Sequence, residues 1–167
     1  MGVYTATRFT FNIYHSTFNI SSIAVSRNNF FSNKVIKINM SKIEIKHPDK
    51  AVSTGAYSAG IFIDGWLFIS GQGSLNLSTG EIIHGSIEEE TLLTLSHIKK
   101  IIDSAGGSID DIVKCTVHLS DINDFEKYNA AYASFFPGVK PARTTVQSVL
   151  FCGMKIEIDA IAKIGKK

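Results

Sequence analysis

The pair Asp64-Gly65 constrains the fold of this 167-residue chain more than any other feature, because it separates two short apolar runs. These runs, residues 58–63 and 66–70, are rich in the β-branched and aromatic residues that favour strands. A two-residue connection of this type forms a type I′ turn, in which both residues take positive φ angles. The sequence therefore predicts a β-hairpin, and Gly71-Gln72-Gly73 is expected to end its second strand.

A helix is predicted after a turn-rich loop at residues 76–80. Ser86-Ile87-Glu88-Glu89 is a capping box, in which the serine accepts from the free N–H groups of the first turn and Glu89 reaches back. Gly106-Gly107 predicts that the helix ends near Ala105. The apolar stripe that we expect to face the core includes Leu92, Leu95, Ile98 and Ile102.

The remaining elements complete an alternating pattern of strands and helices. Residues 43–46 alternate like a first strand, and further strands are predicted at 111–119, 143–149 and 154–164. A second helix begins at residues 123–126 and ends at Pro137-Gly138. Its apolar face is expected to contain Phe125, Tyr128, Tyr132, Phe135 and Phe136. The order β-β-β-α-β-α-β-β indicates an α+β sandwich with both helices packed on one face of a mixed sheet.

Charge divides the chain into an extension, residues 1–39, and a domain, residues 40–167. The extension has Arg8, Arg27, Lys34 and Lys37 but no acidic residue, so its charge is +4. Two interpretations remain open: an organelle transit peptide, which is acid-poor and Ser-rich, or an upstream segment without function before a start at Met40. Neither belongs to the fold. We expect the protein in the cytoplasm, or in mitochondria if the extension is a transit peptide.

The domain itself is slightly acidic and has the composition of a globular protein. From Met40 onward there are 17 − 4 = 13 basic and 15 acidic residues, which argues against a nucleic-acid surface. With 44% apolar residues in the chain, one domain can bury a core. No apolar run reaches the roughly 18 residues of a membrane span, so we expect neither nucleic acid nor membrane as a partner.

Cysteine and histidine do not form a recognisable metal site. Cys115 and Cys152 are too few for a disulfide framework, and no Cys/His spacing is typical of zinc. We expect Cys152 to be a buried, inert thiol. We expect four histidines to be structural or solvated: His47, His84, His97 and His118.

Arg143 and Glu157 suggest a site for a small carboxylic acid. The guanidinium of Arg143 would bind a carboxylate with two parallel hydrogen bonds, and Glu157 would handle a proton or a water. Strand periodicity puts Glu157 on a polar face with Lys155 and Asp159. The opposite face is predicted to be core: Ile156, Ile158, Ala160 and Ala162. A solvated ladder of Lys155, Glu157 and Asp159 is the alternative interpretation.

Ordered motifs over residues 42–164 resemble a known family. They include Gly55-Ala56-Tyr57-Ser58, Phe68-Ile69-Ser70-Gly71-Gln72, Thr79-Gly80-Glu81, Asp111-Ile112-Val113-Lys114, Tyr128-Asn129, Pro141-Ala142-Arg143 and Ile156-Glu157-Ile158. With these motifs the chain resembles the RidA family, also called the YjgF or reactive-intermediate deaminase family. The resemblance implies a chorismate-mutase-like fold, a homotrimer with ligand clefts between subunits, and no metal or organic cofactor.

The resemblance also implies roles for individual residues. Arg143 would hold the substrate carboxylate, Glu157 would activate water, and Tyr57 would orient water or substrate at the cleft edge. Ser70 and Gly71 would let the ligand approach the backbone. Asn129 is a further candidate for substrate binding, with a purely structural role equally open.

This chain departs from the family pattern at two places. Thr145 stands where many members have a cysteine, so a thiol-dependent role cannot apply there, although its size and hydroxyl suit substrate binding. The segment between Arg143 and Glu157 is about one residue shorter than usual, and residues 150–153 form an apolar turn. We expect this turn to shift the lip of the cleft and with it the substrate preference.

The implied activity is hydrolytic deamination of enamines and imines, such as 2-aminoacrylate, to 2-keto acids and ammonia. This is the reaction of a 2-iminobutanoate/2-iminopropanoate deaminase, with small imino and keto acids as partners. The alternative is a non-catalytic trimer that binds small acids as a regulator or a holdase-like protein. The presence of both Arg143 and Glu157 favours the enzyme.

Overall fold

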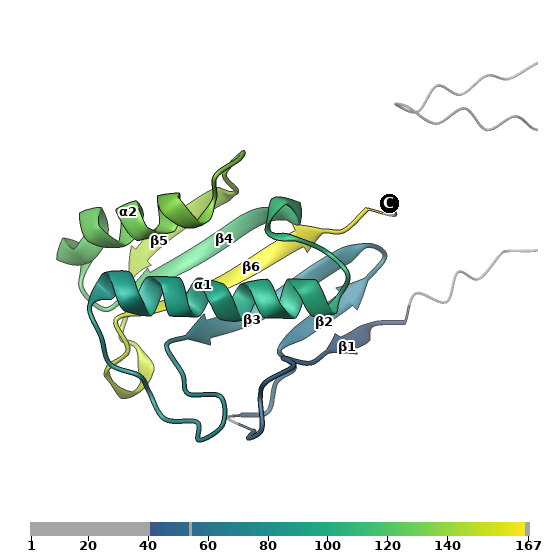
Figure 1. Ribbon diagram of the computed structural model, residues 1–167, viewed down its shortest axis with the longest axis horizontal. Coiled ribbons are helices and arrows are strands. Elements are labelled where there is room, and N and C mark those ends of the chain that lie inside the picture. The colour runs from purple at the N-terminus through teal and green to yellow at the C-terminus, as the bar shows by residue number, and fades with distance from the viewer. Residues whose placement is uncertain (1–40, 54, 166–167) are drawn as a thin grey trace, which may run out of the picture. The chain divides into compact units, whose positions relative to one another are not determined.

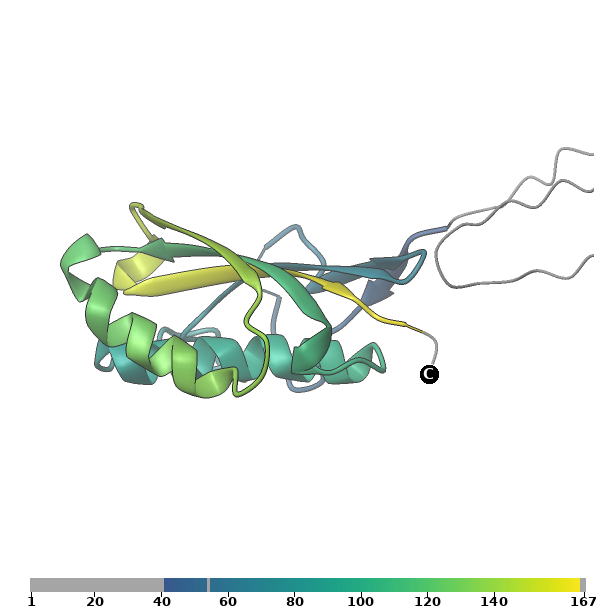
Figure 2. The ribbon, with the colours of Figure 1, turned by 90° about the horizontal axis from the view of Figure 1, so that it is seen from above.

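The computed structural model describes residues 41–53 and 55–165, and the predicted extension, residues 1–39, lies outside them together with Met40. The described part is one six-stranded mixed sheet, and both helices cover the same face of it (Figures 1 and 2). The strands are β1 (Ile43–Ile45), β2 (Gly60–Ile63), β3 (Trp66–Gly73), β4 (Ile112–Leu119), β5 (Ala142–Gln147) and β6 (Ile156–Lys163). The helices are α1 (Ile87–Ser104) and α2 (Phe125–Phe135). The predicted fold class is confirmed.

The predicted hairpin is formed by β2 and β3, but its second strand is longer than expected. Asp64 and Gly65 have φ angles of 49° and 75°, as a type I′ turn requires. The strand continues past the predicted Ser70 and ends at Gly73, within the Gly71-Gln72-Gly73 triplet, after a register shift between Ile69 and Gln72. The side-chain amide of Gln72 donates to the carbonyls of Ser70 (2.8 Å) and Gly71 (3.2 Å) and so stabilises this bulge.

The first helix begins and ends as predicted. Ser86 and Glu89 form the reciprocal capping box. Gly106 has a φ of 78°, and the N–H of Gly107 donates to the carbonyl of Ile102 at 3.1 Å, which closes the last turn. One stripe residue was placed wrongly: Leu92 is 43% exposed. It lies seven residues before the exposed Lys99, two helical turns away, and so belongs to the solvent side.

The core lies between the helices and the sheet. Leu95, Ile98 and Ile102 of α1 and Tyr128 and Tyr132 of α2 are buried there, while Phe125 and Phe135 pack at its edge. The predicted core face of β6 is confirmed: Ile156, Ile158, Ala160 and Ala162 are all buried. The strand order β1-β2-β3-β6-β4-β5 makes β5 an edge strand, parallel to β4.

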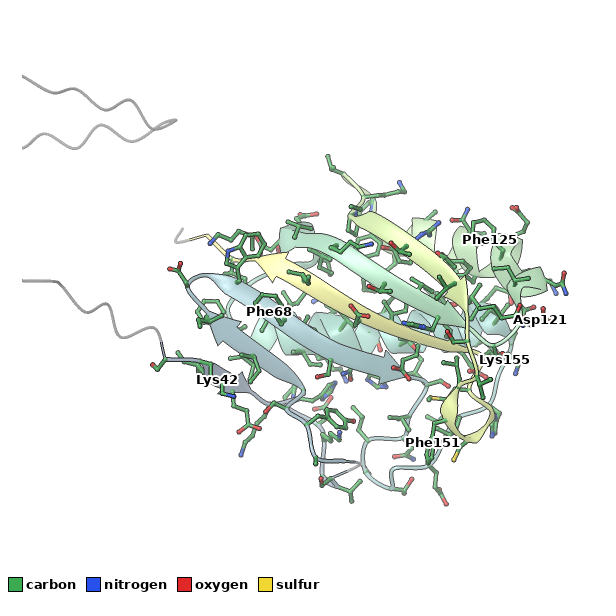
Figure 3. All side chains as sticks on the ribbon, turned by 180° about the vertical axis from the view of Figure 1, so that it is seen from behind. Lys42, Phe68, Asp121, Phe125, Phe151 and Lys155 are labelled. Carbon is green, nitrogen blue, oxygen red and sulfur yellow. The ribbon has the colours of Figure 1, made fainter. Side chains whose placement is uncertain are left out.

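The other face of the sheet carries no helix in the described part of the chain, as the rear view shows (Figure 3). Large apolar side chains are exposed there, including Phe68 (46% exposed), Trp66 and Val146. We call this the open face. Neither helix among the described residues is long and apolar enough to cross a membrane.

Candidate active site

The carboxylate of Glu157 lies directly over Gly71, at the bulge of β3. Glu157 of β6 pairs with Gly73 of β3, and a Cβ added to Gly71 would come within 2.9 Å of the Glu157 Cδ and still closer to its Oε1. A side chain at position 71 would therefore displace the carboxylate. The missing side chain of Gly71 thus leaves the space that the glutamate occupies.

Four of the predicted site residues line one cavity of about 410 Å³ on the Glu157 side of the sheet: Tyr57, Ser70, Gly71 and Glu157. The Ser70 hydroxyl donates to the carbonyl of Ser58 at 2.7 Å, which ties β3 to the segment before β2. The Tyr57 hydroxyl accepts from the Lys50 ammonium at 3.0 Å. The cavity thus combines a carboxylate with a phenol and the backbone of a bulge.

Three other predicted residues form a separate group on β5 and α2, which we call the arginine cluster: Arg143, Asn129 and Thr145. The Arg143 Nη2 donates to the side-chain oxygen of Asn129 at 2.8 Å. Its guanidinium carbon lies 4.6 Å from the ring centre of Tyr132 and 5.1 Å from that of Tyr128. Thr145 shares a 2.5 Å hydrogen bond with the Tyr128 hydroxyl.

The arginine cluster has the electrostatics of an anion site. Within the described residues, Arg143 forms no ion pair with a carboxylate, and its one hydrogen-bonding acceptor is Asn129. A guanidinium has five N–H donors, so donors remain for a ligand. Burial raises the pKa of Tyr128 and that of Tyr132, which keeps both phenols neutral beside the cation. The cluster is therefore a fixed positive charge on an aromatic support.

The cavity and the arginine cluster lie on opposite faces of the sheet. Arg143 and Thr145 pair with Cys115 and Val117 of β4, which are buried under the helices. Glu157 alternates with the buried Ile156 and Ile158 and so points to the open face. Phe125, which also packs near the guanidinium, lies on α2 behind the sheet in Figure 3. The two predicted principal residues do not meet within one chain.

Sequence reasoning missed a buried carboxylate that supports the cavity. Glu90 is 1% exposed and accepts from Ser74 Oγ (3.0 Å), Gly85 N (3.2 Å) and Lys155 N (2.8 Å). Burial alone would raise the pKa of Glu90, but these hydrogen bonds, with one from the Lys155 ammonium, together lower it. Glu90 thereby joins α1 to the loop before it and to the start of β6. Its place in an acidic first turn gave no signal of burial.

The contacts of Lys155 differ from the prediction that it shares a polar face with Glu157 and Asp159. Its ammonium bonds Glu90 at 3.3 Å and the carbonyl of Gly85 at 2.8 Å. Lys155 therefore does not belong to a solvated ladder with Glu157 and Asp159, because α1 and the loop before it engage its ammonium. The role of Glu157 stays a prediction.

The turn before β6 presents two side chains to solvent. Cys152 is exposed, so the expectation of a buried thiol is wrong. Its φ of 49° is followed by 75° at Gly153, and this left-handed pair turns the neighbouring Phe151 outward, 75% exposed. Phe151 lies at the tip of the turn in Figure 3 and lines the cavity.

The four histidines within the described residues are structural or solvent-exposed, as expected. His47 and His97 are buried with their rings 5.3 Å apart, His118 bonds Ser148, and His84 is exposed. No three metal-ligating side chains converge anywhere in residues 41–53 or 55–165.

Comparison with known proteins decides the family. A family model described as endoribonuclease L-PSP matches residues 48–164. The chain belongs to the RidA family. A RutC family protein of Pyrococcus horikoshii is 46% identical over 109 residues, which are 65% of this chain and 86% of the relative. The 2-iminobutanoate/2-iminopropanoate deaminase of Rattus norvegicus is 39% identical over 112 residues, 66% of this chain and 82% of that protein.

Solved structures agree with the RidA-family assignment. TdcF of E. coli, solved with bound serine, superposes with a TM-score of 0.67 at 34% identity and covers 74% of this chain and all of that one. The chorismate-mutase-like fold implied by the sequence resemblance is therefore confirmed.

Proposed function

We propose that this RidA-family protein hydrolyses 2-imino acids, and the enamines in equilibrium with them, to 2-keto acids and ammonia. The observation that carries the proposal is the presence of a carboxylate over the bulge of β3 and of a cation on β5 that has no carboxylate partner among the described residues. The rat relative named as an imine deaminase supports the same reaction class.

The chemistry follows from the two charged groups. Arg143 holds the substrate carboxylate with two N–H···O hydrogen bonds and leaves the C=N carbon facing Glu157. Glu157 accepts a proton from water as the water oxygen bonds to that carbon, and it passes this proton to the imine nitrogen, which gives a tetrahedral adduct with a hydroxyl and an amino group. Glu157 then takes the hydroxyl proton and delivers it to the nitrogen as the C=O bond forms and the C–N bond breaks, releasing ammonia and the 2-keto acid.

A homotrimer is part of this proposal because one chain does not bring Arg143 to Glu157. Arg143 is on the edge strand β5, where a neighbouring subunit can approach it, and the open face presents apolar side chains such as Phe68 that another copy would cover. In the proposed trimer, Arg143 of one subunit completes the cavity of the next. Tyr57, Ser70 and Gly71 then come from the subunit that supplies Glu157, and Asn129 and Thr145 from the subunit that supplies Arg143.

Subunit complementation tests the reaction and the shared site together. Arg143→Ala and Glu157→Gln proteins are each expected to be inactive on 2-aminoacrylate generated in situ. When the two are co-refolded in equal amounts, each mixed trimer has one site of three that receives both native residues from different subunits, so about a quarter of all sites are complete. Recovery of about that share of keto-acid release is expected. Activity that never recovers, with mixed trimers present by native mass spectrometry, would contradict the shared site.

The non-catalytic small-acid binder remains the second candidate. It predicts that the wild-type protein binds a 2-keto acid but does not accelerate ammonia release from the imine. The family model's description as an endoribonuclease is not supported by charge, since residues 40–167 have 13 basic and 15 acidic side chains.

A further inference from the structure

The cavity has an apolar wall that the proposed reaction does not use. Besides Glu157 and Tyr57, it is lined by Leu75, Ile82, Phe151 and Met154. A cavity of about 410 Å³ is within the range of roughly 300–1,000 Å³ that takes drug-sized ligands. The imine of alanine has only a methyl side chain and would leave most of this wall without contact.

Contacts within the chain position the side chains of this wall. Leu75 and Ile82 form an isolated β-bridge, supported by a 2.8 Å hydrogen bond from Asn76 N to Glu81 O. Met154 is buried, and its sulfur fills the space over Gly73, where a side chain would collide with it. These contacts hold the apolar side chains in fixed positions beside the carboxylate.

Phe151 is the exposed member of this wall. The N–H of Met154 donates to the carbonyl of Phe151 at 3.2 Å, and the left-handed angles at Cys152 and Gly153 fix the turn that carries it. A phenyl ring 75% exposed at the mouth of a cavity has apolar surface that a ligand side chain would cover. A polar or very small substituent would gain nothing from this contact.

We propose that Phe151, with Leu75 and Ile82, selects 2-imino acids that have bulky apolar side chains, such as the imine of leucine, over the imine of alanine. This inference rests on the proposed deaminase function and names its substrate class. Phe151 is a specificity residue and has no part in bond breaking.

Two variants, one in this turn and one just before it, test this proposal. Phe151→Ala removes the ring, and Val149→Ala removes a fully exposed apolar side chain that does not line the cavity. The imines of leucine and alanine are generated in situ by an amino-acid oxidase, and keto-acid release gives kcat/KM for each. Phe151→Ala is expected to lower the leucine-to-alanine ratio about 10-fold, as the loss of a few apolar groups from a pocket does. Val149→Ala is expected to leave the ratio at the wild-type value.

The outcomes separate this inference from the proposed function. Turnover of both imines with a ratio unchanged in Phe151→Ala would overturn the specificity role alone. Dissociation of the oligomer by Phe151→Ala in light scattering would also overturn it, because the ring would then be an interface residue. If the wild type turns over neither imine, the proposed reaction fails. Calorimetric titration then tests whether the apolar wall prefers bulky side chains. Tighter binding of 4-methyl-2-oxopentanoate than of pyruvate, with the difference lost in Phe151→Ala, supports this preference. Equal binding of the two acids overturns it.

Discussion

The charged side chains of the arginine cluster and of the cavity are positioned in different ways. Arg143 is held by contact: aromatic rings support its guanidinium and Asn129 takes one of its N–H donors. The carboxylate of Glu157 instead occupies the room that the missing side chain of Gly71 leaves beside an open cavity. A stacked cation suits binding of a ligand carboxylate in every state of the reaction. A carboxylate next to a cavity suits proton transfer, which is needed only in the transition state.

Arg143→Ala should have the largest effect, since it removes the group that is proposed to bind the substrate carboxylate. Truncating one partner of a desolvated charge pair costs roughly 2–5 kcal/mol, so affinity for an inert 2-keto acid should fall at least about 30-fold. Deaminase activity should disappear with it. Calorimetry and keto-acid release measure both, and Lys140→Ala, an exposed cation just before β5, is the matched control. Activity in Arg143→Ala close to that of the wild type would remove Arg143 from the site.

Glu157→Gln should separate catalysis from binding. General-base help is typically worth about 100- to 10,000-fold, so turnover should fall by that order while 2-keto acid affinity changes little. Asp159→Asn, two residues along the same face of β6, controls for the loss of a negative charge. Equal turnover in Glu157→Gln and wild type would make Glu157 a structural residue.

Gly71→Ala should damage the cavity without removing any polar group. The new methyl would displace the Glu157 carboxylate, and a misplacement of about 1 Å can cost up to about 100-fold in rate. Gly138→Ala is the control, because a Cβ there meets only Asp110 Oδ1, at 3.6 Å. Ligand binding at Arg143 should be affected less than turnover. A turnover equal to that of Gly138→Ala would show that Glu157 does not depend on the space at position 71.

The smallest expected effect is a pH dependence of the free energy of unfolding. His47 precedes the segment that carries Tyr57, and burial, together with the nearby His97, lowers the pKa of His47 to about 4. Its Nδ1 accepts from the N–H of Asp49 at 3.1 Å, so the folded state uses the neutral ring. Between pH 6.5 and about 4 the unfolded chain binds more protons than the folded one, and stability should therefore fall as the pH falls through this window.

The stability lost in this window should be on the order of 1–3 kcal/mol. Chemical denaturation from pH 4 to 7 measures it, and His47→Gln should flatten the curve, whereas substitution of the exposed His84 should not. A curve for His47→Gln that is as steep as the wild-type curve would assign the dependence to other groups.

Local chemistry determines much of the fold without any tertiary contact. Positive φ at Asp64 and Gly65, the capping box of Ser86 and Glu89, and the alternation of β6 all depend on interactions between residues close in sequence. The family motifs around Arg143 and Glu157 are also a property of the sequence. These features were predictable because turns, caps and strand periodicity follow from backbone sterics and nearby hydrogen bonds.

The tertiary structure alone decided how these pieces meet. Periodicity gives the relative direction of side chains within one strand, but strand order and register set which face each strand presents. That is why the opposite orientation of Arg143 and Glu157 was invisible in the sequence. The burial of Glu90 depends on Ser74, Gly85 and Lys155, far apart along the chain. Long-range packing brings such groups together, and no local pattern encodes it.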